Sequence, residues 1–182
     1  MCLFGFKSNV MKVLIATLMW SMMSFSTFQP NSFNGQSNPS LKAERLASIS
    51  RYVSWPSNYL SAHFVINVYG SENFYQYLQY AYQNRTIKGF PVLVKNITTP
   101  EEAEGGHVLY FANAEQTSIK EFMTILDGQP QLTIADDSSE SCDLLVIYLT
   151  KEGKFHYNLL ASEKAQLNVS SRLLEVAESI KD

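Results

Sequence analysis

The feature that most limits how this chain can fold is the alternation of short apolar stretches with amphipathic ones. Each apolar stretch has the length and the β-branched or aromatic content of a buried strand. Strands are expected at His63–Gly70, Phe90–Ile97, His107–Phe111 and Leu132–Ala135. Apolar residues at helical spacing precede or separate these strands, at residues 41–53, 72–85 and 117–126. Alternation of this kind predicts a mostly parallel sheet with helices on both faces.

The C-terminal third departs from that alternation. Two apolar runs, Leu144–Leu149 and Phe155–Leu160, are separated by a short charged turn that contains a glycine, which is the spacing of an antiparallel hairpin. A last helix is expected to begin at Ser170 or Ser171 and to continue through Ile180. The predicted fold is therefore α/β: a three-layer α/β/α sandwich of Rossmann-like or flavodoxin-like type, with a mostly parallel sheet and a C-terminal antiparallel hairpin.

The N-terminal residues differ in composition from the rest. Lys7 and Lys12 precede a short uncharged apolar segment, and Ser24-Phe25-Ser26 then offers small residues at a cleavage position. The segment is shorter than the roughly 20 apolar residues of a membrane span, so we interpret residues 1–26 as a signal peptide and the protein as exported to the periplasm. An uncleaved N-terminal anchor and a start at Met11 are the alternatives.

The composition after the leader is that of one folded domain. Residues 27–40 are rich in Asn, Ser, Gln and Pro and are expected to form a flexible linker, followed by a single α/β domain at residues 41–182. The chain is 46% apolar and 17% charged, so it can bury a core. It carries a net charge of −3 and no Lys/Arg run, which argues against nucleic acid as a partner. Loss of the leader leaves Cys142 alone, without a partner for a disulfide or a thiolate zinc site.

No catalytic motif is present. Gly-x-Ser-x-Gly, Gly-x-Gly-x-x-Gly and the P-loop are all missing from the sequence. Each histidine opens or lies inside a predicted strand, and His63, His107 and His156 are not at metal-ligand spacing, which favours structural roles. Cys142 lies in an acidic setting that disfavours a thiolate nucleophile. The acidic residues 136–143 lack the pattern of a calcium loop. We therefore predict no enzyme activity, no cofactor and no metal.

A ligand crevice is nevertheless expected from the fold class. Ligands of open parallel sheets bind outside the carboxyl ends of the strands, near the point where the strand order reverses. The residues that fall there by position are Gly70, Ser71, Asn73, Asn113 and Asp136. A serine beside a helix start also serves as a simple helix cap, and that alternative stays open for Ser71.

The helix expected at residues 72–85 contains more tyrosines than one buried face needs. Tyr75, Tyr77, Tyr80 and Tyr82 span more than one helical face, so some of them are expected to be exposed or covered by another chain. We predict a protein-binding surface at these four residues.

Several segments of the chain resemble one known family. In order they are Tyr52-Val53-Ser54-Trp55-Pro56, the strand at 64–70, Ile87–Val94, Glu104–Phe111, Phe155–Asn158 and Leu167–Leu174. Together, across residues 41–181, they resemble the YfiR-like family of small periplasmic proteins. The motif residues expected to have structural roles are Trp55, Pro56, Gly89, His107, Asn158, Ser170 and Ser171.

The resemblance implies an α/β/α sandwich, a tendency to form homodimers and a regulatory role. The characterised role in the family is repression of a membrane-bound diguanylate cyclase through its periplasmic sensor domain, which holds down cyclic-di-GMP output and biofilm formation. Histidine kinases and transporters are alternative partners. The best-known members also carry cysteine pairs that form redox-responsive disulfides, and Cys142 alone does not supply that switch within one chain.

Three hypotheses follow from the sequence. The first is an exported, non-enzymatic regulator that binds the periplasmic domain of a membrane sensor protein, with no membrane insertion of its own after leader removal. The second is a periplasmic small-molecule-binding protein that uses the crevice near Gly70 and Asn113. The third is an enzyme of unknown class, which requires a nucleophile–base pair that the sequence does not display.

Overall fold

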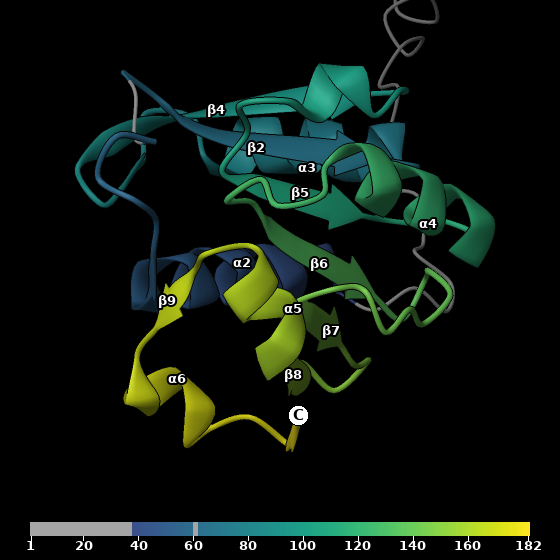
Figure 1. Cartoon of the computed structure of the whole chain (residues 1–182). Coiled ribbons are helices and arrows are strands. Elements are labelled where there is room, and N and C mark those ends of the chain that lie inside the picture. The colour runs from purple at the N-terminus through teal and green to yellow at the C-terminus, as the bar shows by residue number, and fades with distance from the viewer. Residues whose placement is uncertain (1–37, 60–61) are drawn as a thin grey trace, which may run out of the picture. The chain divides into compact units, whose positions relative to one another are not determined.

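The structure is a computed structural model, and it describes residues 38–59 and 62–182. Within these residues eight strands form one sheet in the order β10-β8-β7-β6-β5-β2-β4-β3 (Figure 1). The five strands from β7 to β4 run parallel to one another. Numbered along the chain, those five lie in the order 5-4-3-1-2, which is the flavodoxin-like order. The protein is thus a mixed α/β protein with a mostly parallel central sheet, as the alternation predicts. The residues predicted to form the leader, and most of those predicted to form the linker, lie outside the described residues.

The strands have the following bounds: β1 Val53–Ser54, β2 Phe64–Tyr69, β3 Thr86–Ile87, β4 Phe90–Ile97, β5 Val108–Phe111, β6 Leu132–Asp136, β7 Ile147–Leu149, β8 Phe155–Asn158, β9 Asn168–Val169 and β10 Ser179–Lys181. The helices are α2 Pro39–Tyr52, α3 Glu72–Ala81, η1 Glu101–Ala103, α4 Gln116–Ile125, α5 Leu159–Lys164 and α6 Ser171–Leu174. β1 and β9 form a separate two-stranded pair that ties the end of α2 to the C-terminal segment.

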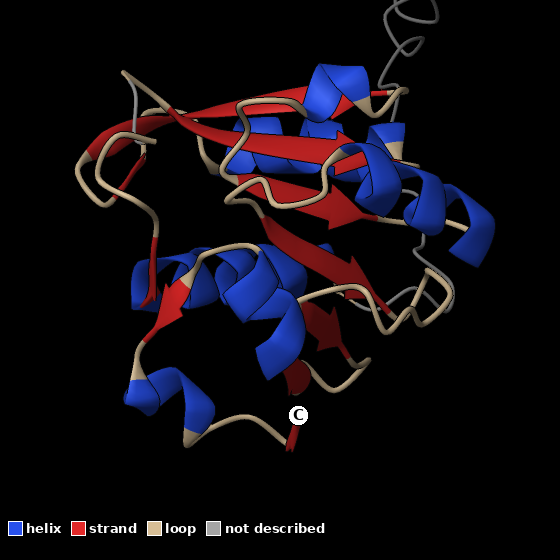
Figure 2. Cartoon of the chain, viewed as in Figure 1, coloured by secondary structure: helices blue, strands red, loops and turns tan. Residues whose placement is uncertain are grey.

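Two apolar cores fill the two faces of the sheet, because successive side chains of a strand point to opposite faces. On β5, Tyr110 belongs to one core and Phe111 to the other. Leu46 of α2 and Leu78 of α3 belong to the first core, whereas Phe122 of α4 belongs to the second. Figure 2 shows α3 and α4 on opposite sides of the strands, with α4 nearer the viewer. Every residue of β2 from 64 to 68 and every residue of β5 is buried, as expected of strands covered on both faces.

The first hairpin depends on a turn that the sequence pattern did not reveal. β3 pairs antiparallel with the start of β4, with Ile87 opposite Phe90. The two residues between the strands, Lys88 and Gly89, both have positive φ, at 52° and 85°. Two residues of positive φ make the type I′ turn, whose twist matches that of the flanking strands. Gly89 therefore has a turn role, in line with the expected structural use of this motif residue.

The C-terminal predictions need three corrections. The hairpin is confirmed, since β7 pairs antiparallel with β8, but β8 ends at Asn158 and Leu160 lies in α5. The Asn158 side chain accepts a hydrogen bond from the Ala161 backbone N–H at 3.0 Å, which starts a helix where a strand was expected. The last helix is a single turn, and Ile180 lies in β10, which pairs with β8. One helical turn is marginal alone, so the open edge of β8 decides the conformation of residues 179–181.

Two other boundaries are also corrected. The helix expected at residues 72–85 ends at Ala81. Tyr82 is its C-cap and Asn84 has a positive φ of 60°, so the chain turns there toward β3. The residues Thr99-Pro100-Glu101-Glu102 have the order typical of a capped helix start, but only the one-turn η1 forms there, and Thr99 does not cap it. Instead the Glu102 carboxylate accepts hydrogen bonds from the backbone N–H groups of Thr98 and Thr99, at 2.6 and 3.2 Å.

Candidate functional site

The carboxyl ends of β2 and β5 meet at the point where the strand order reverses, and Gly70 lies there. Gly70 has φ of +90°, and a Cβ on it would lie 2.0 Å from the carbonyl oxygen of Ala112. The backbones of the two loops thus touch at the place where the fold class predicts a crevice. Ser71 caps α3 by accepting the Phe74 N–H at 3.2 Å, and Asn73 lies exposed in the first turn.

Asp136, at the end of β6, is 1% exposed and has a full set of partners. Its carboxylate accepts the Tyr110 hydroxyl at 2.8 Å and the Ser138 N–H at 2.9 Å, and it also binds the Ser138 hydroxyl. The ammonium of Lys42, from α2, lies 2.6 Å away. Burial, together with the Asp136 charge, raises the pKa of Tyr110 well above its ordinary value, so the hydroxyl stays protonated as the donor.

Asn113 is held by the same loop. Its φ is +58°, and its backbone N–H donates to the Ser138 hydroxyl at 3.1 Å. The structure therefore gathers Gly70, Ser71, Asn113 and Asp136 at one end of the sheet, as predicted, and gives Gly70, Ser71 and Asp136 contacts within the fold. Ligand binding by these residues stays a prediction.

The opposite, amino end of the sheet is organised around His107. The ring is fully buried and stacks on Phe64 with 5.0 Å between centroids, while Trp55 and Tyr59 meet it edge-on. His107 Nδ1 accepts the Val65 N–H at 3.0 Å, so the proton of the neutral ring is on Nε2. Burial lowers the pKa of His107, an effect that the backbone of Tyr59 partly offsets. Trp55 Nε1 donates to the His107 carbonyl at 3.1 Å, which fixes both residues.

Two buried amides lie beside that ring cluster. Asn67 and Gln131 both donate to the Ala103 carbonyl, at 3.0 and 2.6 Å, and Gln131 also donates to the Gly106 carbonyl at 2.9 Å. A Cβ on Gly106 would lie 2.1 Å from the Asn67 amide nitrogen, so only glycine leaves room for this arrangement. Asn67 Oδ1 and Gln131 Oε1 have no hydrogen-bond partner within the described residues.

The four tyrosines of the predicted protein-binding surface have different environments. Tyr82 is 3% exposed and donates its hydroxyl to the Ala43 carbonyl at 2.6 Å, so it belongs to the core and not to a surface. Burial raises its pKa beyond any physiological range. Tyr75 and Tyr77 are half-buried against the first core. Tyr80 is 79% exposed, so the outer face of α3 offers Tyr80 and the edges of Tyr75 and Tyr77 to a partner.

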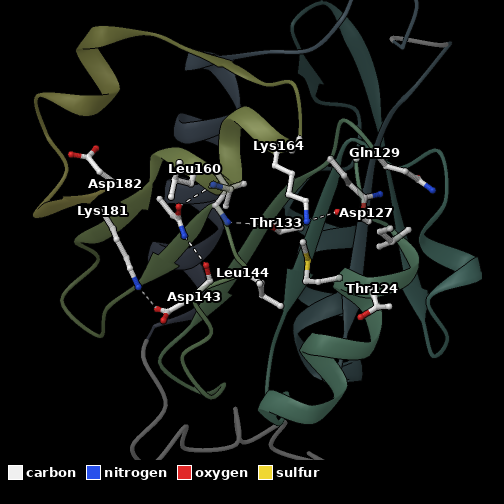
Figure 3. Close-up of a pocket in the computed structure, with 18 residues that line it drawn as sticks. Thr124, Asp127, Gln129, Thr133, Asp143, Leu144, Leu160, Lys164, Lys181 and Asp182 are labelled. Carbon is white, nitrogen blue, oxygen red and sulfur yellow. Dashed lines mark hydrogen bonds and ion pairs between the residues drawn. The ribbon is translucent and has the colours of Figure 1, made fainter.

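A pocket of about 580 Å³ lies between the end of α4 and α5, and no sequence signal pointed to it (Figure 3). Leu126, Val146 and Ala161 contribute apolar lining, and Leu144 and Leu160 are exposed beside it. Two ion pairs lie among its lining residues: Lys164 with Asp127 at 2.6 Å, and Lys181 with Asp143 at 2.8 Å. The size is that of a site for a small organic molecule. No local pattern indicates this pocket, because Leu159 and Leu160 at the start of α5 fall in the expected strand.

The structure brings one histidine and one serine together. His156 Nδ1 and Ser179 Oγ lie 2.7 Å apart, and Glu178 Oε2 is 3.9 Å from His156 Nε2. His156 and Ser179 are directly opposite neighbours on β8 and β10, and Glu178 also binds Lys154 at 2.8 Å. All three side chains are substantially exposed and do not line the pocket between α4 and α5, which fits a cross-strand contact better than a nucleophile–base pair. Cys142 is buried in the second core. No cluster of metal-ligating side chains occurs in the described part of the chain.

The model of one protein family matches residues 39–178 of this sequence, under the description YfiR/HmsC-like. This chain belongs to the YfiR/HmsC-like family. A search of curated proteins found no match. Members of the family are periplasmic regulators of signalling that act on a membrane partner. Among residues 38–59 and 62–182, no helix has the length and apolarity needed to cross a bilayer.

The family-motif residues have structural contacts in the described chain. Trp55 and His107 hold the amino end of the sheet together, and Pro56 follows directly on Trp55, its carbonyl accepting the Tyr59 N–H at 2.9 Å. Asn158 caps α5 and also donates to the Asp143 carbonyl at 2.7 Å. Ser170 caps α6 through the Arg172 N–H, and Ser171 is the first residue of that helix. The motif residues thus identify the fold, and their contacts do not indicate which surface binds a partner.

Proposed function

We propose that this protein is an exported, non-enzymatic regulator that binds the periplasmic domain of a membrane-bound signalling protein and modulates its output. Family membership over residues 39–178 carries this proposal. The geometry supports the non-enzymatic part of the proposal. The motif residues make contacts that hold the domain together, and the loops at the carboxyl end of the sheet are joined by internal contacts. The output most consistent with the family resemblance is that of a diguanylate cyclase, with a histidine kinase as the alternative.

The proposal includes finer points. Residues 1–26 are a cleaved signal peptide, residues 27–40 link it to the domain, and the mature protein is periplasmic. The domain is a three-layer α/β/α sandwich, a class supported by the two apolar cores on the two faces of the sheet. The mature protein forms a homodimer, which sedimentation equilibrium of the purified exported form tests directly.

The experiment that tests the function is capture of the tagged, exported protein from cross-linked cell envelopes, followed by reconstitution. Each captured membrane protein is cloned as its isolated periplasmic domain, and binding is measured with both partners purified. The expected result is saturable binding to the periplasmic domain of a protein with a cytoplasmic cyclase or kinase module. Deletion of the regulator is then expected to change the activity of that module in cells. Binding to no signalling domain, together with unchanged cyclic-di-GMP and kinase output in the deletion strain, would overturn the proposal.

A small-molecule-binding function is the second candidate, and the pocket between α4 and α5 favours it over the carboxyl-end crevice. A bound ligand stabilises the folded state by mass action, so it raises the melting temperature of the full chain. The test is a thermal-shift screen of periplasmic metabolites with the wild-type protein and with Ala161→Phe, which fills the pocket. Ala81→Phe on α3 is the matched control. A ligand that shifts wild type and the control but not Ala161→Phe supports this candidate, and the same shift in all three excludes the pocket.

A further inference from the structure

The outer edge of β4 is a strand edge that the fold leaves open. β4 has eight residues, and its inner side pairs with β2 from Val92 to Ile97. On the outer side β3 covers only Phe90 and Pro91, with one more hydrogen bond from the Val92 N–H to the Arg85 carbonyl at 3.1 Å. On this outer side, the remaining residues of β4 have no strand beside them in the described chain.

The free peptide groups on this edge can be assigned. N–H and C=O groups of one residue point the same way, and successive residues alternate. Because Val92 points outward to Arg85, Val94 and Asn96 also point outward, and their peptide groups have no hydrogen-bond partner within the described residues. Thr98, the next outward residue, donates its N–H to Glu102 and so ends the open edge. An unpaired edge of this kind is a template for an added strand.

An open hollow of about 490 Å³ lies along this edge. It is lined by Tyr75 of α3, by β4 residues 94–97 and by Glu102 of η1. Val94 packs into the first core, on the α3 face, whereas Ile97 packs into the second. An added strand would therefore present alternate side chains to Tyr75 on one face and to Leu93 and Lys95 on the other. In this arrangement Tyr75, one of the residues predicted to bind a partner, would contact a side chain of the added strand.

The charge around the edge favours an acidic partner. Residues 73–100 contain Arg85, Lys88 and Lys95 and no acid, in a chain whose net charge is −3. Lys95 is exposed and makes no ion pair with any described residue. The acids at the two ends are engaged, since Glu72 accepts from Asn96 at 2.5 Å and Glu102 caps the loop at Thr98.

We propose that the outer edge of β4, from Leu93 to Ile97, binds an extended segment of the partner protein as an added strand, with an acidic residue opposite Lys95. This inference rests on the proposed function and adds to it the kind of segment that is recognised. A second copy of this chain is a poorer occupant. Pairing the free stretch 93–97 antiparallel with itself, centred on its middle residue, sets Lys95 directly against the Lys95 of the other copy, and like charges in that position destabilise the pair.

The test is an NMR titration of the isotope-labelled exported protein with two synthetic probes. Both are seven-residue peptides of alternating Thr and Val, one with Asp and one with Lys at the centre. The expected result is that the Asp peptide shifts the backbone amide signals of Val94 and Asn96 and slows their hydrogen exchange. It is expected to bind at least about threefold more tightly than the Lys peptide at low salt, as an opposite-charge cross-strand pair predicts.

Two variants, each with a matched control, make the result specific. Asn96→Pro removes an outward N–H that the fold does not use, and it is expected to abolish peptide binding, while Asn96→Ala keeps the N–H and retains binding. Lys95→Glu is expected to reverse the preference between the two peptides, and Lys120→Glu on α4 is expected to leave it unchanged. An unaltered fold is checked for each variant from the remaining amide signals. Shifts centred on β10 instead, at Ile180, or equal binding of both peptides by wild type and Lys95→Glu would overturn the proposal.

The same variants separate this inference from the proposed function. If Asn96→Pro binds the purified signalling domain as well as Asn96→Ala does, the function stands and the β4 edge is not its site. If the peptides bind at β4 as described but no signalling domain is found, the edge is a strand-binding site and the proposed function fails. Cross-linking of two copies through β4 at micromolar concentration would show that Lys95 does not prevent self-pairing and would overturn the choice of occupant.

Discussion

The two ends of the parallel sheet differ in how their buried polar groups are satisfied. At the carboxyl end the Asp136 carboxylate binds four polar groups of Tyr110, Ser138 and Lys42, and Gly70 leaves room for the Ala112 carbonyl, which a Cβ would meet at 2.0 Å. At the amino end two buried polar atoms, on Asn67 and Gln131, lack a partner within the described residues. An unsatisfied buried group costs free energy, whereas a satisfied network resists change. The comparison predicts that substitutions at the carboxyl end will cost more stability than those at the amino end.

The largest expected effect is that of Gly70→Ala. The new Cβ meets a backbone carbonyl and φ is positive, so we expect a loss of about 3 kcal/mol or more in the free energy of unfolding. Gly89→Ala is the matched control, because its φ is +85° but no atom lies within 4 Å of the added Cβ, and it is expected to cost only about 1 kcal/mol. Urea denaturation monitored by circular dichroism measures both. Equal losses would show that backbone strain, not the approach to Ala112, decides the cost.

The next effect is that of Asp136→Asn. The amide still accepts the Tyr110 hydroxyl, but Lys42, whose side chain is 11% exposed, loses its closest counter-charge. We expect a loss of about 2–3 kcal/mol, moderated by Asp137 at 3.3 Å from the same ammonium. Lys42→Met alone and combined with Asp136→Asn completes a double-mutant cycle. Additive losses in that cycle would contradict the coupling described for the carboxyl end.

A much smaller effect is expected of Asn67→Leu at the amino end. The substitution removes the unpartnered Oδ1, and the Ala103 carbonyl keeps its hydrogen bond from Gln131. Because the lost bond and the lost unsatisfied oxygen offset each other, the change in unfolding free energy is expected to be under about 1 kcal/mol. The same denaturation series measures it, with Asn96→Leu on the exposed part of β4 as a control for the change of residue type. A loss as large as that of Asp136→Asn would remove the contrast between the two ends.

The smallest effect is the pH dependence from His107. Burial lowers the pKa of His107 below its ordinary value of about 6.5, so the unfolded chain takes up a proton at a higher pH than the folded protein. The contribution to stability is therefore full above pH 6.5 and is lost as the pH falls from there to the folded-state pKa. We expect His107→Gln to flatten the slope of unfolding free energy between pH 7.5 and 5.5. His156→Gln, on an exposed strand face, is the control, and an equal flattening by both would contradict the assignment to His107.

Local patterns predicted the strands and helices of the central sheet well, because β2, β4, β5 and β6 are buried on one face or both and their residue types reflect it. They also indicated the caps at Ser71 and Ser170, where a side-chain oxygen precedes a helix. The failures lie where the local signal is short. Lys88-Gly89 makes a type I′ turn without the usual Asn-Gly pair, and Leu159-Leu160, at the start of α5, continues the apolar run of the preceding strand.

The class of fold and the family follow from the sequence alone, because strand length, apolar period and motif residues are local properties of the chain. Which buried polar groups have hydrogen-bond partners depends on the packing of distant segments. The tertiary structure placed Gly70 against the Ala112 carbonyl, moved Tyr82 into the core, created the pocket between α4 and α5, and left the outward peptide groups of Val94 and Asn96 open. The physical reason is that each of these depends on which strands become neighbours, and neighbours are set by packing between residues far apart in the sequence.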